Sequence, residues 1–272
     1  MSMKTETDHL HNNNIFNHAD QELADYLKRK NLAYTNKKWT VPTPKRSFYS
    51  KYGKRLLDLT IAIPVFIILI PVYVIIAFGV LIDLGRPVFY KQTRVGRDGK
   101  IFDVIKFRSM NNKKDENGEL LPPSQRVTRF GKFIRKYSLD ELMEFWNIIC
   151  GDMSIIGPRP LAVFFVDRMS ERHKMRHAVR PGLECPRVVT LNYEYNSRYQ
   201  LTFENDVWYV EHISFLQDVK MVFLLIKMVF SFKRRSAQAT AEGIGYFSGY
   251  DENGLAVSMR TYKMPEKETS EE

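Results

Sequence analysis

Hydrophobic residues gather in one place along this chain: Leu59–Ile82 is a mainly apolar segment without a charged side chain. It is long enough for a bilayer core, which needs about 20 residues. Pro64 and Pro71 interrupt it, and Pro71 lies near its centre. Because proline removes a backbone donor and clashes with the preceding turn, the sequence predicts a helix break near Pro71. Each arm would be about 16–18 Å long, too short to span alone.

Two membrane topologies fit this segment. Basic residues flank both ends, with Lys54 and Arg55 before it and Arg86 and Lys91 after it. Since Lys and Arg favour the cytoplasmic side, a re-entrant hairpin that enters and leaves on one face satisfies both flanks. A proline-kinked single span is the alternative, because neighbouring groups can satisfy the freed backbone. Asp58, at the entrance, is expected to pair with Arg55 or Arg86.

Periodicity elsewhere predicts an α+β fold that is mostly helical. Strands joined by a glycine-flanked turn are predicted over Pro87–Gln92 and Lys100–Phe107, as a short β-hairpin. Apolar residues three and four apart predict amphipathic helices over Arg129–Tyr137, Leu139–Ile149 and Ile213–Phe230, the last of them either interfacial or buried. Further predictions are helices over Asp20–Leu32 and Leu161–Val179, short β-prone pieces over 183–210, and a weakly structured or capping tail from Ser236.

Composition restricts the partners. The 272 residues are 44% hydrophobic and 26% charged, which is ordinary for a globular chain with one membrane insertion. The net charge of +10 suits phosphorylated ligands or acidic lipid. Nucleic acid is disfavoured, because no reader motif is present. Cys150 and Cys185 lack disulfide-framework or zinc spacing and are expected to be buried thiols in a reducing compartment. Residues 1–45 are polar and contain no signal-peptide core.

Asp140-Glu141 is the most informative acidic pair, and it has two interpretations. In the structural one, Ser138 and Glu141 form a capping box that begins a helix, and Asp140 complements the helix dipole. In the functional one, the pair uses its basic surroundings, with Arg135 just upstream. A carboxylate beside such cations can hold Mg²⁺ against a phosphate or attack phosphorus itself.

Several cations could grip phosphate. Lys106 and Arg108 alternate around Phe107, so both are expected on one face of the second strand. Arg159 lies between two prolines, in a stiff loop that would present its guanidinium to a phosphate or nucleotide. Solvated charges or a structural salt bridge are the alternatives.

Three further polar residues are weaker candidates for contacts with a phosphate or nucleotide. His177 and Arg180 are three residues apart, on one face of a predicted helix end. Asp206 lies in the segment FENDVWYV. A surface histidine satisfied by its neighbours is the plain alternative for His177.

Several long motifs, taken together, resemble one family. KRLLDLTIAIPVFIILIPV, PVFYKQTRVGRDGKIFDVIKFRSM, SLDELMEFWNIICGDMSIIGPRPL and HAVRPG occur in that order. They resemble the bacterial sugar transferases, or monotopic phosphoglycosyl transferases, from about Lys54 to Gly182. The resemblance resumes at NDVWYVEHISFLQDVKMVF. Long motifs in sequence are far more specific than one short motif.

The resemblance implies a re-entrant membrane hairpin and a catalytic domain on the cytoplasmic face of the bacterial inner membrane. It implies transfer of sugar-1-phosphate from a UDP-sugar to undecaprenyl phosphate, with release of UMP and a requirement for Mg²⁺. The expected regions are a polar extension (1–47), the hairpin (48–86), the catalytic domain (87–235) and a tail (236–272). The sugar, the pathway and the oligomeric state, including a homo-oligomer, are left open. A non-catalytic scaffold that binds anionic lipid or nucleotide is the alternative function.

Residue roles follow from the same resemblance. Asp140 would be the nucleophile that forms a phosphosugar intermediate, and Glu141 its partner in handling metal or protons. Lys106, Arg135 and Arg159 would bind phosphate. Phosphoryl transfer depends mainly on positioning and charge neutralisation, so such a cluster suits it.

The chain also departs from the family pattern in two places. Ile70 stands where members often have serine before the hairpin proline. LECPRVVTL, beginning at Leu183, replaces the usual ITGWAQV after the RPG motif. The second departure bears on which sugar is handled.

Overall fold

The computed structural model describes residues 18–187, 198–230 and 246–262. Within these ranges the chain is mostly helical, with three small two-stranded sheets. The longer helices are α2 (His18–Lys38), α3 (Lys54–Ile68), α4 (Ile70–Leu84), α6 (Arg129–Lys136), α7 (Glu144–Cys150), α9 (Arg198–His212) and α10 (Phe215–Phe230). The strands are β1 (Phe89–Val95), β2 (Ile101–Phe107), β3 (Ser154–Ile156), β4 (Gly182–Glu184), β5 (Phe247–Tyr250) and β6 (Ala256–Ser258). The short helices are η1 (Tyr49–Gly53), η2 (Arg97–Gly99), α5 (Pro123–Arg126), η3 (Leu139–Glu141), η4 (Val163–Arg168), α8 (Glu171–Lys174) and η5 (Met175–Ala178).

The apolar segment breaks where the sequence predicts. Helix α3 ends at Ile68, Leu69 forms the junction, and Pro71 lies in the first turn of α4. A proline is tolerated there because its missing N–H would have no partner within the helix. No single helix in the described ranges is long and apolar enough to cross a membrane. Tyr49–Ile68 and Ile70–Leu84 reach that length and apolar character only as a pair, with a bend of 58° between them.

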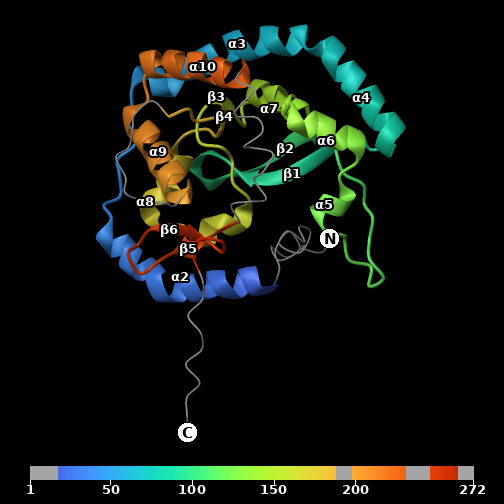
Figure 1. Ribbon diagram of the computed structural model, residues 1–272. Coiled ribbons are helices and arrows are strands. Elements are labelled where there is room, and N and C mark those ends of the chain that lie inside the picture. Colours follow the sequence, from blue (N-terminus) through green and yellow to red (C-terminus); the bar gives the residue numbers. More distant parts are fainter. Residues whose placement is uncertain (1–17, 188–197, 231–245, 263–272) are drawn as a thin grey trace, which may run out of the picture.

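The bent pair has one face on the protein and one face open. Tyr73, Ile76 and Val80 are buried against Phe107 of β2 and Ile134 of α6. The opposite face carries apolar side chains that are between 62% and 73% exposed: Leu56, Ile68, Val74, Ile75, Phe78 and Ile82. In Figure 1, α10 lies along the same edge of the molecule as α3 and α4. Helix α10 likewise exposes apolar residues, among them Leu216 and Phe223.

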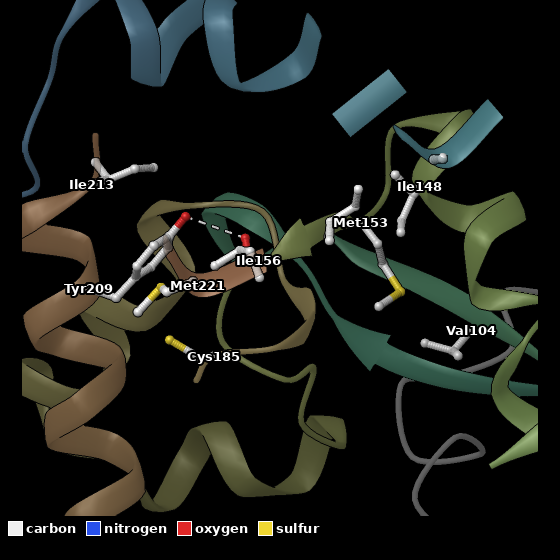
Figure 2. Close-up of a cluster of buried hydrophobic side chains, with 10 residues drawn as sticks. Val104, Ile148, Met153, Ile156, Cys185, Tyr209, Ile213 and Met221 are labelled. Atoms are coloured by element: carbon white, nitrogen blue, oxygen red, sulfur yellow. Dashed lines mark hydrogen bonds between the residues drawn. The ribbon is translucent and has the colours of Figure 1, made fainter. Parts of the chain in front are cut away.

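The main core lies beneath that edge. Figure 2 shows side chains of one buried cluster: Tyr209 of α9 and Met221 of α10 lie near Ile156 of β3, and Val104 of β2 and Ile148 of α7 lie on the side of Met153. Strands β3 and β4 run parallel, with Ile156 paired to Glu184. Their approach requires glycine at 182, since a Cβ there would lie 2.2 Å from the nitrogen of Gly157. This close pairing fixes the backbone of Gly157 and Pro158, which follow β3 and hydrogen-bond to β4.

A buried carboxylate joins the bent pair to the core. Asp218 of α10 is fully buried, and its oxygens accept hydrogen bonds from Tyr49, Lys54 and Tyr209. The Lys54 ammonium lies 2.9 Å from Asp218 and 3.8 Å from Asp58. The predicted pairing of Asp58 with Arg55 or Arg86 is therefore wrong, because Lys54 lies one helical turn away on the same face.

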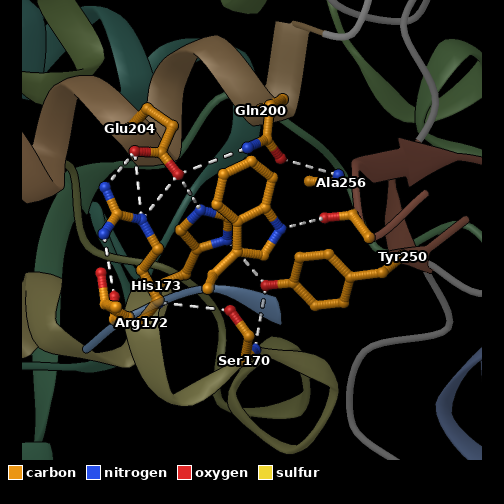
Figure 3. A network of polar contacts seen from close by, with 10 residues as sticks. Ser170, Arg172, His173, Gln200, Glu204, Tyr250 and Ala256 are labelled. Carbon is orange, nitrogen blue, oxygen red and sulfur yellow. Dashed lines mark hydrogen bonds and ion pairs between the residues drawn. The ribbon is translucent and has the colours of Figure 1, made fainter. Parts of the chain in front are cut away.

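Helix α2 packs on the β5–β6 hairpin, at the opposite edge of the molecule from α3 and α10 (Figure 1). Figure 3 shows how this unit is attached. The Tyr250 hydroxyl contacts the Ser170 amide and the His173 ring, and His173 contacts Glu204 of α9. Arg172 forms an ion pair with the same carboxylate. The described part of the tail is thus a folded cap, one of the two predicted forms, and α2 is longer than predicted.

Four sequence predictions are wrong in this region. Leu161–Val179 is not one helix but η4, α8 and η5: Met169 and Ser170 have extended backbone angles and separate η4 from α8, and η5 follows α8 directly. The β-prone prediction for 183–210 fails beyond β4, because α9 occupies Arg198 onward; residues 188–197 lie outside the described ranges. His177 and Arg180 do not share a helix face, since η5 ends at Ala178. Cys150 is exposed, whereas Cys185 is buried as predicted.

Substitution Asp218→Asn should destabilise the protein by about 3–5 kcal/mol, because it leaves the Lys54 ammonium buried without its nearest counterion. The measurement is the unfolding midpoint in detergent. Adding Lys54→Met to this variant should recover part of the loss. A double variant less stable than Asp218→Asn would contradict the assigned pairing.

The cap should weaken in acid. Burial favours a raised pKa for Glu204, but His173 and Arg172 outweigh it and lower the pKa to about 2. A carboxylate whose pKa is lowered by folding stabilises the fold at pH values above its ordinary pKa near 4.5. This stabilisation is lost as the pH falls toward about 2. The stability difference between wild type and Glu204→Gln should therefore shrink over that pH range. A matched control is Glu171→Gln, whose side chain is 57% exposed. A difference that stays constant with pH would refute the expectation.

Candidate active site

Lys106 of strand β2 lies between two acids, Glu141 of η3 and Glu144 of α7. Lys106 Nζ lies 2.6 Å from Glu141 Oε1 and 3.3 Å from Glu144 Oε1. Asn147 of α7 fixes the strand against the helix: its side-chain oxygen accepts from the Ile105 amide, and its nitrogen donates to another carbonyl of β2. The strand that carries Lys106 is therefore fixed by contacts to the backbone of the residues just before it.

The acidic pair does not begin a regular helix. Ser138 has a left-handed backbone conformation, with φ of 54°, and its side chain makes no capping hydrogen bond. The predicted capping box is therefore wrong, and Leu139–Glu141 forms a 3-10 turn before α7 begins at Glu144. Glu141 has cationic partners from β2 and from the loop after β3, and such charge-assisted hydrogen bonds are stronger than one to a backbone amide.

Asp140 differs sharply from Glu141. Its half-buried carboxylate makes no hydrogen bond or ion pair to another side chain in the described ranges. Its pKa is raised, first by burial and then by the charge of Glu141, while Lys106 and Arg135 act in the opposite direction. For Glu141, burial also favours a higher pKa, but Arg159 and Lys106 outweigh it and lower the pKa to about 2. Asp140 is thus the acid of the pair whose oxygens remain available to a ligand.

The GPRP loop after β3 supplies Arg159. Its Nη2 donates to both oxygens of Glu141, at 2.9 and 3.0 Å, and its side chain remains 41% exposed. From beneath, Arg176 donates to the Arg159 carbonyl at 2.9 Å. Asp206 in turn accepts two hydrogen bonds from Arg176, and both of these side chains are buried. Asp206 therefore acts on the site through Arg176 and does not face a ligand.

The other predicted site residues differ in their exposure and hydrogen-bond partners. Arg135 is exposed and makes no ion pair within the described ranges, so its guanidinium is free to bind an anion. Arg108 instead donates to three backbone carbonyls: that of Met110, that of Leu84 at the end of α4, and that of Arg86 just after it. Arg180 donates to the Gly151 carbonyl after α7. His177 has a buried Nε2 with no partner in the described structure, and burial lowers its pKa to about 3, so the ring is neutral.

Three further charged residues belong to this region and were not among the predicted site residues. Glu144 is buried beside Lys106, and its spacing of three from Glu141 could have indicated it. Arg94 is half-buried and makes no hydrogen bond in the described ranges; its pKa is lowered first by burial and then by Arg159. The hairpin register pairs Arg94 with Phe102 and Tyr90 with Lys106, so Arg94 and Lys106 project from the same face. Glu184 of β4 lies 3.9 Å from Arg159, a contact that no local pattern could reveal.

The donor set suits a magnesium ion only in part. The described residues contain no group of three or more His, Cys, Asp or Glu side chains placed to hold a metal. Mg²⁺, however, keeps several waters and commonly binds through one or two carboxylates together with substrate phosphates. Asp140 fits this pattern, whereas both oxygens of Glu141 already accept hydrogen bonds from Arg159.

Comparison with known proteins agrees with this geometry. The family model for bacterial sugar transferase matches residues 49–232, so the chain belongs to the bacterial sugar transferase family. It is 40% identical over 179 residues to the uncharacterized sugar transferase EpsL of Bacillus subtilis strain 168, an alignment that covers 65% of this chain and 86% of EpsL.

Two other relatives have named reactions. The chain is 35% identical over 195 residues to the UDP-N-acetylgalactosamine-undecaprenyl-phosphate N-acetylgalactosaminephosphotransferase of Aeromonas hydrophila, covering 70% of this chain and 45% of that protein. It is 36% identical over 183 residues to the UDP-glucose:undecaprenyl-phosphate glucose-1-phosphate transferase of Escherichia coli K12, covering 64% and 39%. The chain thus spans less than half the length of these two relatives.

Proposed function

We propose that this chain transfers sugar-1-phosphate from a UDP-sugar to undecaprenyl phosphate and releases UMP, as the initiating step of glycoconjugate assembly. The relatives in Aeromonas and Escherichia are named for reactions of this type. The observation that carries the proposal is the contrast within the acidic pair. Glu141 is held by Lys106 and Arg159, whereas the Asp140 carboxylate makes no hydrogen bond or ion pair to another side chain among the described residues.

The chemistry follows from that contrast. A carboxylate oxygen of Asp140 attacks the phosphorus that bears the sugar, and the bond from that phosphorus to the bridging oxygen breaks, which releases UMP. A phosphate oxygen of the lipid then attacks the same phosphorus and restores the Asp140 carboxylate. Lys106, Arg159 and the free Arg135 reduce the repulsion between the nucleophile and the anionic diphosphate.

Mg²⁺ would bind at Asp140 together with the donor's phosphates and would supply further charge neutralisation. The residues of this chain do the rest of the positioning: Arg176 supports the backbone of Arg159, and Arg159 orients Glu141.

The exposed apolar face of α3 and α4 would sit in the lipid as a re-entrant hairpin, with α10 lying in the interface. In that arrangement the acidic pair would lie at the cytoplasmic surface of the bacterial inner membrane, where a water-soluble nucleotide sugar and a lipid phosphate can meet. The exposure of the apolar side chains on these helices supports the arrangement, because exposed apolar patches of this kind mark contacts with lipid or protein.

Substitution Asp140→Asn should reduce UMP release from UDP-sugar and undecaprenyl phosphate by about a thousandfold or more, since the amide is a poor nucleophile. Asp98→Asn, at the exposed turn of the β1–β2 hairpin, is the control and should keep full activity. Without the lipid acceptor, wild type should gain the mass of one sugar phosphate on Asp140. Full activity of Asp140→Asn would refute the proposal. A non-catalytic scaffold predicts no turnover in any variant.

Removal of divalent metal should abolish UMP release, and Mg²⁺ added back should restore it. The assay is the same, with EDTA and then an excess of MgCl2. Undiminished turnover in EDTA would exclude a role for the ion.

Cysteines placed at Arg46 and Arg86, in a Cys150→Ser background, should react with a membrane-impermeant maleimide from the cytoplasmic side only. Both positions are exposed and flank the bent pair. Labelling from opposite sides would show a kinked span instead of a re-entrant hairpin.

A further inference from the structure

Glu184 is a charged residue at the candidate active site. Hydrogen bonds from two different elements fix its backbone. Its carbonyl accepts from the Gly157 amide at 3.1 Å, across the β3–β4 pair. The carbonyl of the next residue, Cys185, accepts from buried Asn205 at 3.0 Å. The carboxylate therefore projects from a rigid position and not from a free loop.

The two oxygens of this carboxylate are used differently. Oε1 accepts from the Cys185 amide at 3.1 Å. Oε2 lies 3.9 Å from Arg159 Nη1, which is too far for a hydrogen bond. No other hydrogen bond or ion pair reaches Oε2 in the described ranges, and the side chain is 24% exposed. An acceptor with open lone pairs therefore lies directly beside the exposed guanidinium of Arg159.

A carboxylate can only accept hydrogen bonds, and it repels anions. Glu184 thus cannot bind the donor's diphosphate, although it neighbours the cation proposed to do so. In a UDP-sugar, the second phosphate is bonded to the sugar, whose hydroxyl and amide groups are hydrogen-bond donors. Glu184 lies in LECPRVVTL, the segment in which this chain departs from the family pattern.

We infer that Glu184 is a specificity-determining residue, which accepts a hydrogen bond from the donor's sugar and selects neutral sugars over uronic acids. This inference rests on the proposed function. A charged hydrogen bond gained with one sugar, together with repulsion of the other, corresponds to a preference of about tenfold or more in kcat/KM.

The test compares matched pairs of donors that differ only at C6: UDP-glucose with UDP-glucuronic acid, and the corresponding galactose and N-acetylgalactosamine pairs. UMP release is measured with undecaprenyl phosphate for wild type, Glu184→Gln and Glu184→Thr. Glu184→Gln keeps the shape and an acceptor but removes the charge. Glu171→Gln is the control, because that exposed carboxylate forms an ion pair with Lys174, within its own short helix.

Wild type should prefer the neutral member of each pair, and both Glu184 variants should reduce that preference about tenfold or more while Glu171→Gln keeps it. An unchanged preference, or an equal loss on both members of a pair, would show that Glu184 merely orients Arg159 and would overturn the inference. Absence of UMP release by wild type from every donor would instead overturn the proposed function. Thermal unfolding of each variant distinguishes a loss of fold from either result.

Discussion

The arrangement of this protein depends on the buried carboxylate of Asp218. An ionised group cannot leave water without partners, and three hydrogen-bond donors from η1, α3 and α9 meet at this one side chain. These contacts join the entrance of the apolar bent pair to α10. A second contact joins it to the core strand β3, since Asp58 accepts a hydrogen bond from Ser154. The apolar face of α3 and α4 is consequently held at a fixed orientation relative to β2, which carries Lys106, and to α7, which follows the acidic pair of η3.

The candidate site divides two neighbouring acids into different roles by their surroundings. Glu141 is fixed by two cations, and its pKa is depressed to about 2. Asp140 makes no hydrogen bond or ion pair to another side chain in the part of the chain that the structure describes, and its pKa is raised. The supporting contacts are layered: Asp206 orients Arg176, Arg176 holds the backbone of Arg159, and Arg159 holds Glu141. A free carboxylate beside fixed cations suits the attack on a diphosphate that we propose, because little reorganisation is required when charge develops.

The region outside the family match is part of the same folded body. Helix α2 and the β5–β6 hairpin lie beyond residues 49–232, yet they attach through Tyr250 and His173 to Glu204 on α9, the helix that also carries Asp206. The cap and the site thus share one supporting helix. The segments on either side of the family match are therefore attached to the helix whose Asp206 supports Arg176 and, through it, Arg159.

The sequence by itself determined the features that depend on local rules: the helix break near Pro71, the β1–β2 hairpin, the amphipathic helices α6 and α10, and Asp140 with its basic neighbours. Local proline chemistry, strand alternation and helical spacing dictate these directly. Only the tertiary structure decided which acid is free, because the partners of Glu141 come from β2 and from a loop far along the chain. The capping box failed for the same reason, since distant cations outcompete a local backbone amide. Arg94, Glu144 and Glu184 join the site only through strand register and helix packing, which no local pattern specifies.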